Sequence, residues 1–199
     1  MFLVGLTGGL GAGKSTVARM LAERGAVLVD ADELAHRALD PVSPAYREVC
    51  DLFGDEVVTP SGELDRAAIA ATVFADPERR RALESIVHPE VFRMLAEIVQ
   101  ARRETDDIIV FDAPLIVETG FDDACDVVVV VTAPEEERVA RVAARGMTPD
   151  QARARIRAQI GDRERGAAAD VVIPNDGDLE ELRRRVDDLW EQLRARGGR

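Results

Sequence analysis

The stretch Gly5–Thr16, GLTGGLGAGKST, decides the fold of this chain. It follows the apolar residues Phe2–Val4, and four glycines fall between Gly8 and Gly13. Glycine weakens both helices and strands, so this density predicts a loop whose backbone must approach a ligand closely. Residues 8–15 fit the pattern G-x-x-x-x-G-K-[ST], between a predicted strand and a predicted helix, which is typical of a P-loop.

A P-loop predicts a nucleoside triphosphate as ligand, because glycine N–H groups and a helix N-terminus together favour phosphate oxygens. Lys14 is expected to reach the β- and γ-phosphates, and Ser15 to offer its hydroxyl to Mg²⁺. Lys14 is also the only lysine among 26 basic residues, which indicates a need for a compact charge. The alternative is a flexible glycine turn followed by lysine. The predicted nucleotide-binding residues here are Gly9, Leu10, Gly11, Ala12, Gly13, Lys14, Ser15 and Thr16.

Composition narrows the classes of protein to consider. The 199 residues suffice for one α/β domain with insertions, and 46% hydrophobic with 32% charged residues is ordinary for a soluble protein. A net charge of −12 argues against nonspecific nucleic-acid binding. The isolated Cys50 and Cys125 predict a reducing compartment. No apolar run is long enough to cross a membrane, and no signal peptide is recognisable. We therefore expect a cytoplasmic protein without nucleic-acid or membrane partners.

The order of apolar runs and helical patterns predicts an α/β fold. The predicted class is a P-loop NTPase-type parallel five-stranded sheet with helices on both faces, a helical substrate insertion and a lid. About seventy residues, from 32 to 107, contain no clear strand, and this exceeds one crossover helix. Helical periods are expected there, broken at residues 40–41, 59–62, 76–77 and 88–89. The predicted strands are Phe2–Leu6, Ala26–Val29, Ile108–Phe111, Val127–Val131 and Val171–Ile173. The predicted helices include Lys14–Arg24, Pro134–Arg145, one starting at the capping box Thr148–Gln151, and Leu179–Arg196.

Three acidic residues follow predicted strands, at the sheet edge where ligands bind in such folds. Asp112 ends a Walker B pattern, which predicts an acid that orients Mg²⁺; the alternative is a loop aspartate that caps the next turn. Asp30 and Asp32 follow the second strand. Because aspartate commonly caps helices, one of the pair could do only that. The other is expected beside the γ-phosphate as the base for an attacking hydroxyl.

Arginines are concentrated between residues 138 and 165. Arg138, Arg141 and Arg145 recur at i, i+3 and i+7, on one face of a predicted helix. Most of these side chains are expected to form a solvated surface paired with acids. A lid over a triphosphate needs one or two such cations, which would stabilise charge on the transferring group and exclude water.

Together these residues resemble the dephospho-coenzyme A kinase family over nearly the whole chain. The P-loop is generic, and three other motifs are more discriminating in this order and spacing. They are His88-Pro89, D-x-P-L at 112–115, and A-D-x-V-I-x-N-x-G at 169–177. Shorter matches are GELDR at 62–66 and ARIRAQ at 154–159.

The resemblance implies that the γ-phosphoryl group of ATP passes to the ribose 3′-hydroxyl of dephospho-coenzyme A, giving coenzyme A and ADP in the last step of coenzyme A synthesis. It implies ATP and Mg²⁺ as cofactors. Residues 1–38, 105–133 and 169–199 correspond to the nucleotide-binding core, 39–104 to the helical coenzyme A domain and 134–168 to the lid. A monomer or weak homo-oligomer is expected.

The resemblance also implies roles for individual residues. The catalytic set is Asp32, Lys14 and Arg141, with Asn175 on the adenine side and Ser15 and Asp112 at the metal. The implied acceptor-binding residues are Thr7, Asp32, Arg66, His88, Pro114 and Leu115. From the residues alone, His88-Pro89 favours a helix break with a hydrogen-bonded histidine.

Other functions stay open at this stage. Another small-metabolite or nucleotide kinase would differ only in what fills the helical insertion. A P-loop switch such as a GTPase is a second possibility, but guanine recognition normally needs N-K-x-D, and residues 175–178 read NDGD. A nucleotide-bound sensor that transfers nothing is the third.

Overall fold

The computed structural model describes residues 1–197. The chain divides into two compact units, and each is described by itself. The core unit comprises residues 1–29 and the chain from Arg102 onward, and the helical unit comprises Asp30–Ala101. The helical unit thus begins at Asp30, whereas the predicted insertion began at residue 39.

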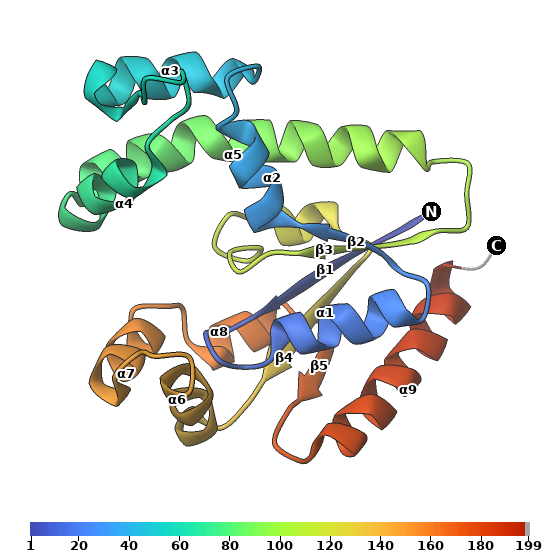
Figure 1. Cartoon of the computed structure of the whole chain (residues 1–199). Coiled ribbons are helices and arrows are strands. Elements are labelled where there is room, and N and C mark those ends of the chain that lie inside the picture. The colour runs from blue at the N-terminus through green and yellow to red at the C-terminus, as the bar shows by residue number, and fades with distance from the viewer. Residues whose placement is uncertain (198–199) are drawn as a thin grey trace. The chain divides into compact units, whose positions relative to one another are not determined.

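The core unit contains a five-stranded sheet of order β2-β3-β1-β4-β5 (Figure 1). β1 pairs in parallel with both β3 and β4, and β4 pairs in parallel with β5. The valine- and isoleucine-rich runs form central strands because both faces of such a sheet are covered. The predicted five-stranded parallel sheet is confirmed. The strands are β1 (Phe2–Gly8), β2 (Val27–Asp30), β3 (Ile108–Asp112), β4 (Val127–Thr132) and β5 (Val171–Pro174).

Two helices cover one face of this sheet, α1 (Lys14–Glu23) and α9 (Leu179–Gly197), and they contact each other. Their apolar stripes pack with inward-facing strand residues in one cluster. On the opposite face, Ile116 and Cys125 lie against Gly5, and Phe121 stacks edge-on against Phe111. The segment between β3 and β4 therefore covers that face over the central strands.

The register brings the carboxyl ends of the central strands together. Asp112 at the end of β3 lies beside Leu6, and Gly8 at the end of β1 lies beside Val131 of β4. The P-loop begins where β1 ends, with strands on both sides. This is the edge at which ligands bind in parallel α/β sheets.

Three short helices follow β4, namely α6 (Glu135–Ala143), α7 (Pro149–Arg157) and α8 (Asp162–Ala167). The predicted capping box is confirmed, since Thr148 and Gln151 exchange hydrogen bonds at the start of α7. Val139, Val142, Ala152 and Ile156 form a small buried cluster between α6 and α7. We call residues 134–168 the lid segment.

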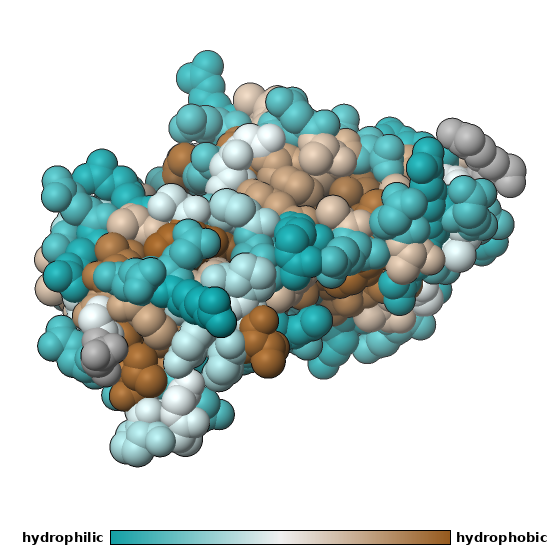
Figure 2. Space-filling model, turned by 90° about the horizontal axis from the view of Figure 1, so that it is seen from above, coloured by the Kyte–Doolittle hydropathy of each residue, from teal (hydrophilic) through white to brown (hydrophobic). Residues whose placement is uncertain are grey.

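The helical unit is built around one long helix, α5, which α2, α3 and α4 all contact (Figure 1). Turns containing Gly54 and Gly62, both with positive φ, separate the shorter helices. The face seen in Figure 2 is mainly hydrophilic, with hydrophobic residues showing between the polar ones. The helices are α2 (Ala31–Ala38), α3 (Pro44–Phe53), α4 (Arg66–Ala75) and α5 (Pro77–Ala101), and Asp55–Val57 form a 3₁₀ turn.

The predicted helix break at His88-Pro89 is wrong, because α5 continues through both residues. Proline inside a helix costs about 3 kcal/mol through one lost hydrogen bond and a steric clash. Buried side chains lie on both sides of Pro89, among them Val87, Val91 and Leu95. Burying each such side chain contributes roughly 1.5–3 kcal/mol, so packing outweighs the local cost of proline.

A buried carboxylate ties α5 to the loop before α3. Glu90 is 7% exposed, and it accepts hydrogen bonds from Arg93 at 2.7 and 2.9 Å and from the Ser43 hydroxyl at 3.4 Å. The hydrogen bond from Arg93 is the main reason that the pKa of Glu90 lies below its usual 4.5, although burial opposes the shift.

This shift predicts how the stability of the helical unit depends on pH. A carboxylate whose pKa is lower in the folded state stabilises above its unfolded pKa, and this contribution disappears as pH falls through the folded value. We expect Glu90→Gln to reduce the thermal stability at pH 6 and to narrow its difference from wild type below about pH 4.5. Circular dichroism melts between pH 6 and 3 measure this. Glu97→Gln is the matched control, because Glu97 pairs with the same Arg93 but is exposed. Parallel curves for wild type and Glu90→Gln would contradict the assignment.

Candidate active site

Each P-loop glycine has a neighbour that leaves no room for a side chain. A Cβ on Gly8 would lie 2.6 Å from the Val131 carbonyl, and one on Gly9 would clash with the Arg138 guanidinium. Gly11 and Gly13 also have φ of +78° and +99°, which L side chains rarely adopt. Packing against backbone atoms therefore requires glycine at positions 8 and 11, and the positive φ favours it at positions 11 and 13.

The loop leads directly into α1, whose first N–H groups have no intrahelical partners. Its N-cap, Gly13, has no side chain that could satisfy them. Such a helix start favours an anion by its N–H groups and its partial positive charge. Ser15 and Thr16 lie in this first turn, as the sequence predicted.

Lys14, the first residue of α1, forms an ion pair with Asp112 at the end of β3. The side chain of Asp112 is only 8% exposed, so its charge needs a nearby cation. The structure thus brings together the two residues that the P-loop and Walker B patterns singled out.

A cavity of about 320 Å³ lies beside the P-loop within the core unit. Gly11, Gly13 and Thr16 form one side, and Arg141, Arg145 and Asn175 contribute to the remainder. Asn175 donates from Nδ2 to the Ala12 carbonyl at 2.7 Å, and its own carbonyl accepts from Arg141 at 2.9 Å. Arg141 and Asn175, which are 34 positions apart in the sequence, therefore lie together against the P-loop.

Arg138 is a residue of the site that the sequence did not separate from its neighbours. It is 4% exposed, its Nε donates to the Leu10 carbonyl at 2.9 Å, and it pairs with Asp162 at 3.0 Å. Arg165 is fully buried and pairs with Glu118 and Asp162. The i, i+3 spacing of arginines is the same whether their side chains face solvent or pack against a loop. Helical spacing therefore could not predict that Arg138 is buried.

The core unit contains three of the residues that were predicted to bind the acceptor substrate, namely Thr7, Pro114 and Leu115. The hydroxyl of Thr7 is fully buried and donates to the Pro114 carbonyl at 3.2 Å, which joins β1 to the segment after β3. Leu115, the next residue, is 37% exposed. The hydrogen bond from Thr7 therefore holds this segment against β1. Contact of these residues with the acceptor substrate stays a prediction.

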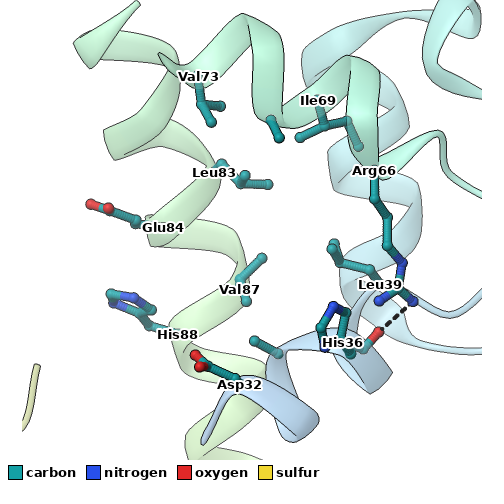
Figure 3. A pocket seen from close by; sticks show the side chains of 12 residues that line it. Asp32, His36, Leu39, Arg66, Ile69, Val73, Leu83, Glu84, Val87 and His88 are labelled. Carbon is teal, nitrogen blue, oxygen red and sulfur yellow. Dashed lines mark hydrogen bonds between the residues drawn. The ribbon is translucent and has the colours of Figure 1, made fainter. Parts of the chain in front are cut away.

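The helical unit has a mostly apolar cavity of about 430 Å³ between α2, α4 and α5 (Figure 3). The predicted residues Asp32, Arg66 and His88 all line it. Arg66 donates to the carbonyl of His36 at 3.0 Å and so reaches from α4 to α2. The apolar lining comes from Ala35, Leu39, Ile69, Ala70, Val73, Leu83 and Val87.

The two aspartates after β2 have different environments. The Asp30 carboxylate is the N-cap of α2 and accepts from the N–H groups of Asp32 at 2.8 Å and Glu33 at 3.4 Å. Within residues 1–197 the Asp32 carboxylate has no hydrogen-bond partner, and it lies at the cavity. Asp30 therefore caps the helix, as expected for one of the pair, and Asp32 is available for a ligand.

Two features are absent from residues 1–197. No group of three or more His, Cys, Asp or Glu side chains is placed to hold a metal ion by itself. No helix among these residues is long and apolar enough to cross a membrane.

Known proteins are similar to this chain over nearly its whole length. The family model described as dephospho-CoA kinase matches residues 2–181. A dephospho-CoA kinase of Thermobifida fusca is 47% identical over 98% of both chains. One of Streptomyces avermitilis is 46% identical over 97% of this chain and 94% of the relative.

Solved structures agree with the fold. A crystal structure from Thermus thermophilus has a TM-score of 0.81 and 41% identity, and the match covers 96% of this chain and 97% of the other. A dephospho-CoA kinase from Campylobacter jejuni has a TM-score of 0.75 at 23% identity over 97% of each chain, which supports the fold alone.

Proposed function

Because the chain belongs to the dephospho-CoA kinase family, we propose that its core unit binds ATP and its helical unit binds dephospho-coenzyme A. The chain is an ATP-dependent kinase of the final step of coenzyme A synthesis. The γ-phosphoryl group passes to the ribose 3′-hydroxyl, and the products are coenzyme A and ADP. The main support for ATP binding by the core unit is the P-loop itself. Its four glycines precede Lys14, which forms an ion pair with Asp112.

Phosphoryl transfer needs positioning and charge stabilisation more than covalent help from the protein. The N–H groups at the start of α1 would hold phosphate oxygens, and Lys14 would leave Asp112 to neutralise charge on the β- and γ-phosphates. The cavity beside Asn175 and Arg141 would take the adenosine end of ATP, since it adjoins the P-loop at Gly13. Arg141 would add a second positive charge.

We propose that Ser15 and Asp112 hold Mg²⁺ together with the phosphates of ATP. A hydroxyl and a carboxylate are hard oxygen ligands of the kind Mg²⁺ prefers, and two protein groups suffice when substrate oxygens complete the shell. The nearly buried Asp112 carboxylate fits this role. When bound, the ion would neutralise phosphate charge.

On the acceptor side, the cavity of the helical unit supplies apolar walls and five polar residues, which are Asp32, His36, Arg66, Glu84 and His88. Asp32 would accept the proton of the 3′-hydroxyl or orient that hydroxyl for in-line attack. Arg66 would oppose the acceptor's diphosphate charge, and His88 would hydrogen-bond to the acceptor. Thr7, Pro114 and Leu115 would support or contact the acceptor from the core.

The overall reaction is tested by mixing protein, Mg²⁺, ATP and dephospho-coenzyme A and measuring ADP. We expect ADP to form in step with coenzyme A and to stay near background without the acceptor. Equal ADP release with and without acceptor would indicate an ATPase. Faster turnover with another hydroxyl metabolite would favour a different small-metabolite kinase.

Arg141→Ala is expected to lower kcat by about 10²-fold, because it removes a cation from the developing phosphoryl charge. Arg153→Ala is the matched control on the same lid segment. The ion pairs of Arg153 are with Glu135 and Glu136, which lie outside the P-loop, so its loss should change kcat less than about twofold. Steady-state kinetics with ATP and acceptor varied separately would decide. Similar small effects of both substitutions would remove Arg141 from the mechanism.

We also propose that the protein acts in the cytoplasm as a monomer or weak homo-oligomer. Both cysteines are free, and burial raises the pKa of the Cys125 thiol to about 12, which keeps this thiol protonated and unreactive. Sedimentation at two protein concentrations measures the oligomeric state.

A further inference from the structure

Leu10 of the P-loop is held by the lid segment on both sides of its backbone. Its N–H donates to Gln159 Oε1 at 2.8 Å, and its carbonyl accepts from Arg138 Nε at 2.9 Å. Its side chain packs against the apolar cluster between α6 and α7. One residue of the phosphate loop thus makes polar and apolar contacts with residues almost 130 and 150 positions away.

These contacts fix the position of the whole turn. Gly9 lies directly under the Arg138 guanidinium, and a Cβ on Gly11 would lie 2.6 Å from the Arg138 carbonyl. The turn from Gly9 to Gly11 is therefore held in place by the lid segment. The Leu10 N–H is used by Gln159 and the Ala12 N–H by the Gly9 carbonyl, so other N–H groups of the loop and of the start of α1 are left for the phosphates.

We propose that Gln159 is a positioning residue of the kinase reaction, which holds the P-loop turn ready for the triphosphate and couples the lid segment to nucleotide affinity. The proposal rests on the proposed role of the P-loop in binding ATP. Gln159 lies between α7 and α8, at the end of ARIRAQ. Its amide accepts a hydrogen bond without bringing negative charge near the triphosphate, which a glutamate would do.

The affinity for ATP depends on how far the P-loop is preorganised before ATP binds. A loop that is already held in its binding conformation loses less entropy when the ligand binds. Removing one neutral hydrogen bond that holds the loop is expected to weaken ATP binding by a factor of about three to ten. Coupling is reciprocal, so if the lid segment holds the P-loop for ATP, bound ATP also holds the lid segment.

The test is Gln159→Met, which keeps the length of the side chain and removes the acceptor. We expect the Kd of ATP, measured by calorimetry without acceptor substrate, to rise about three- to tenfold. The KM of dephospho-coenzyme A should stay within twofold. Gln151→Met is the matched control, because Gln151 bonds only to the capping box within the lid segment. It should leave the Kd of ATP within twofold of wild type.

Limited trypsin digestion supplies a readout that a merely structural role would not move. The lid segment offers cleavage sites after Arg153, Arg155 and Arg157. ATP should slow cleavage there in wild type and in Gln151→Met, and much less in Gln159→Met. Thermal melts without nucleotide identify any variant that fails to fold; Gln159→Leu then takes the place of Gln159→Met.

Two outcomes are clearly separated. If wild type binds ATP and Gln159→Met has the same Kd and the same protection of the lid segment, the coupling proposal is wrong. If wild type itself binds no ATP, the proposed function fails instead.

Discussion

Replacing Lys14 with arginine is expected to lower kcat by at least about 10²-fold, or ~2.7 kcal/mol in barrier, with the fold intact. The loop around Lys14 is packed so tightly that its glycines admit no side chain. A compact ammonium can exchange its ion pair with Asp112 for the phosphates of ATP. A planar guanidinium is larger and can bind Asp112 through two hydrogen bonds, so it would be misplaced and harder to release.

The control for this substitution is Arg19→Lys, the reverse exchange at an exposed position of the same helix α1. Its kcat should equal that of wild type within experimental error. Circular dichroism melts would show whether both variants fold. Activity of Lys14→Arg within about threefold of wild type, ~0.7 kcal/mol, would refute the role of Lys14 in transfer.

The P-loop and the parallel sheet were predictable because their signals are local. Glycines, lysine and serine at fixed spacing between a strand and a helix define the loop, and runs such as Val127–Val131 have few alternatives to a buried strand. The Walker B position of Asp112 follows from the same reasoning. Its ion pair with Lys14 is then a consequence of the parallel register.

The contacts of the lid segment were not predictable, because they depend on packing between distant residues. Arg138 and Arg141 have the same spacing signal, yet Arg138 is buried over Gly9 and Arg141 contacts Asn175. The continuation of α5 through Pro89 has a similar cause. A local preference worth about 3 kcal/mol is overridden by side chains that are buried on both sides of it.

The second large effect is expected for Asp32→Asn, which should lower kcat by at least about 10²-fold with little change in the Kd of ATP. A ribose hydroxyl is a weak nucleophile at neutral pH, and a carboxylate that takes or orients its proton contributes roughly 10²–10⁴-fold. The transition state is loose, so orientation can be the larger part. Asparagine keeps the shape of the side chain and removes the charge. ATP affinity should persist, because we assign it to the P-loop.

The structure makes Asp30→Asn a sharp control. Asp30 is the N-cap of α2, and asparagine caps nearly as well as aspartate, so this variant should keep both fold and activity. Asp30→Ala should cost about 1 kcal/mol of stability without a matching loss of kcat. Asp32 caps nothing, so Asp32→Asn should melt close to wild type. Steady-state kinetics, calorimetry with ATP and thermal melts of all three variants measure these effects. A larger loss of kcat in Asp30→Asn than in Asp32→Asn would reverse the two roles, because the capping geometry alone cannot produce it.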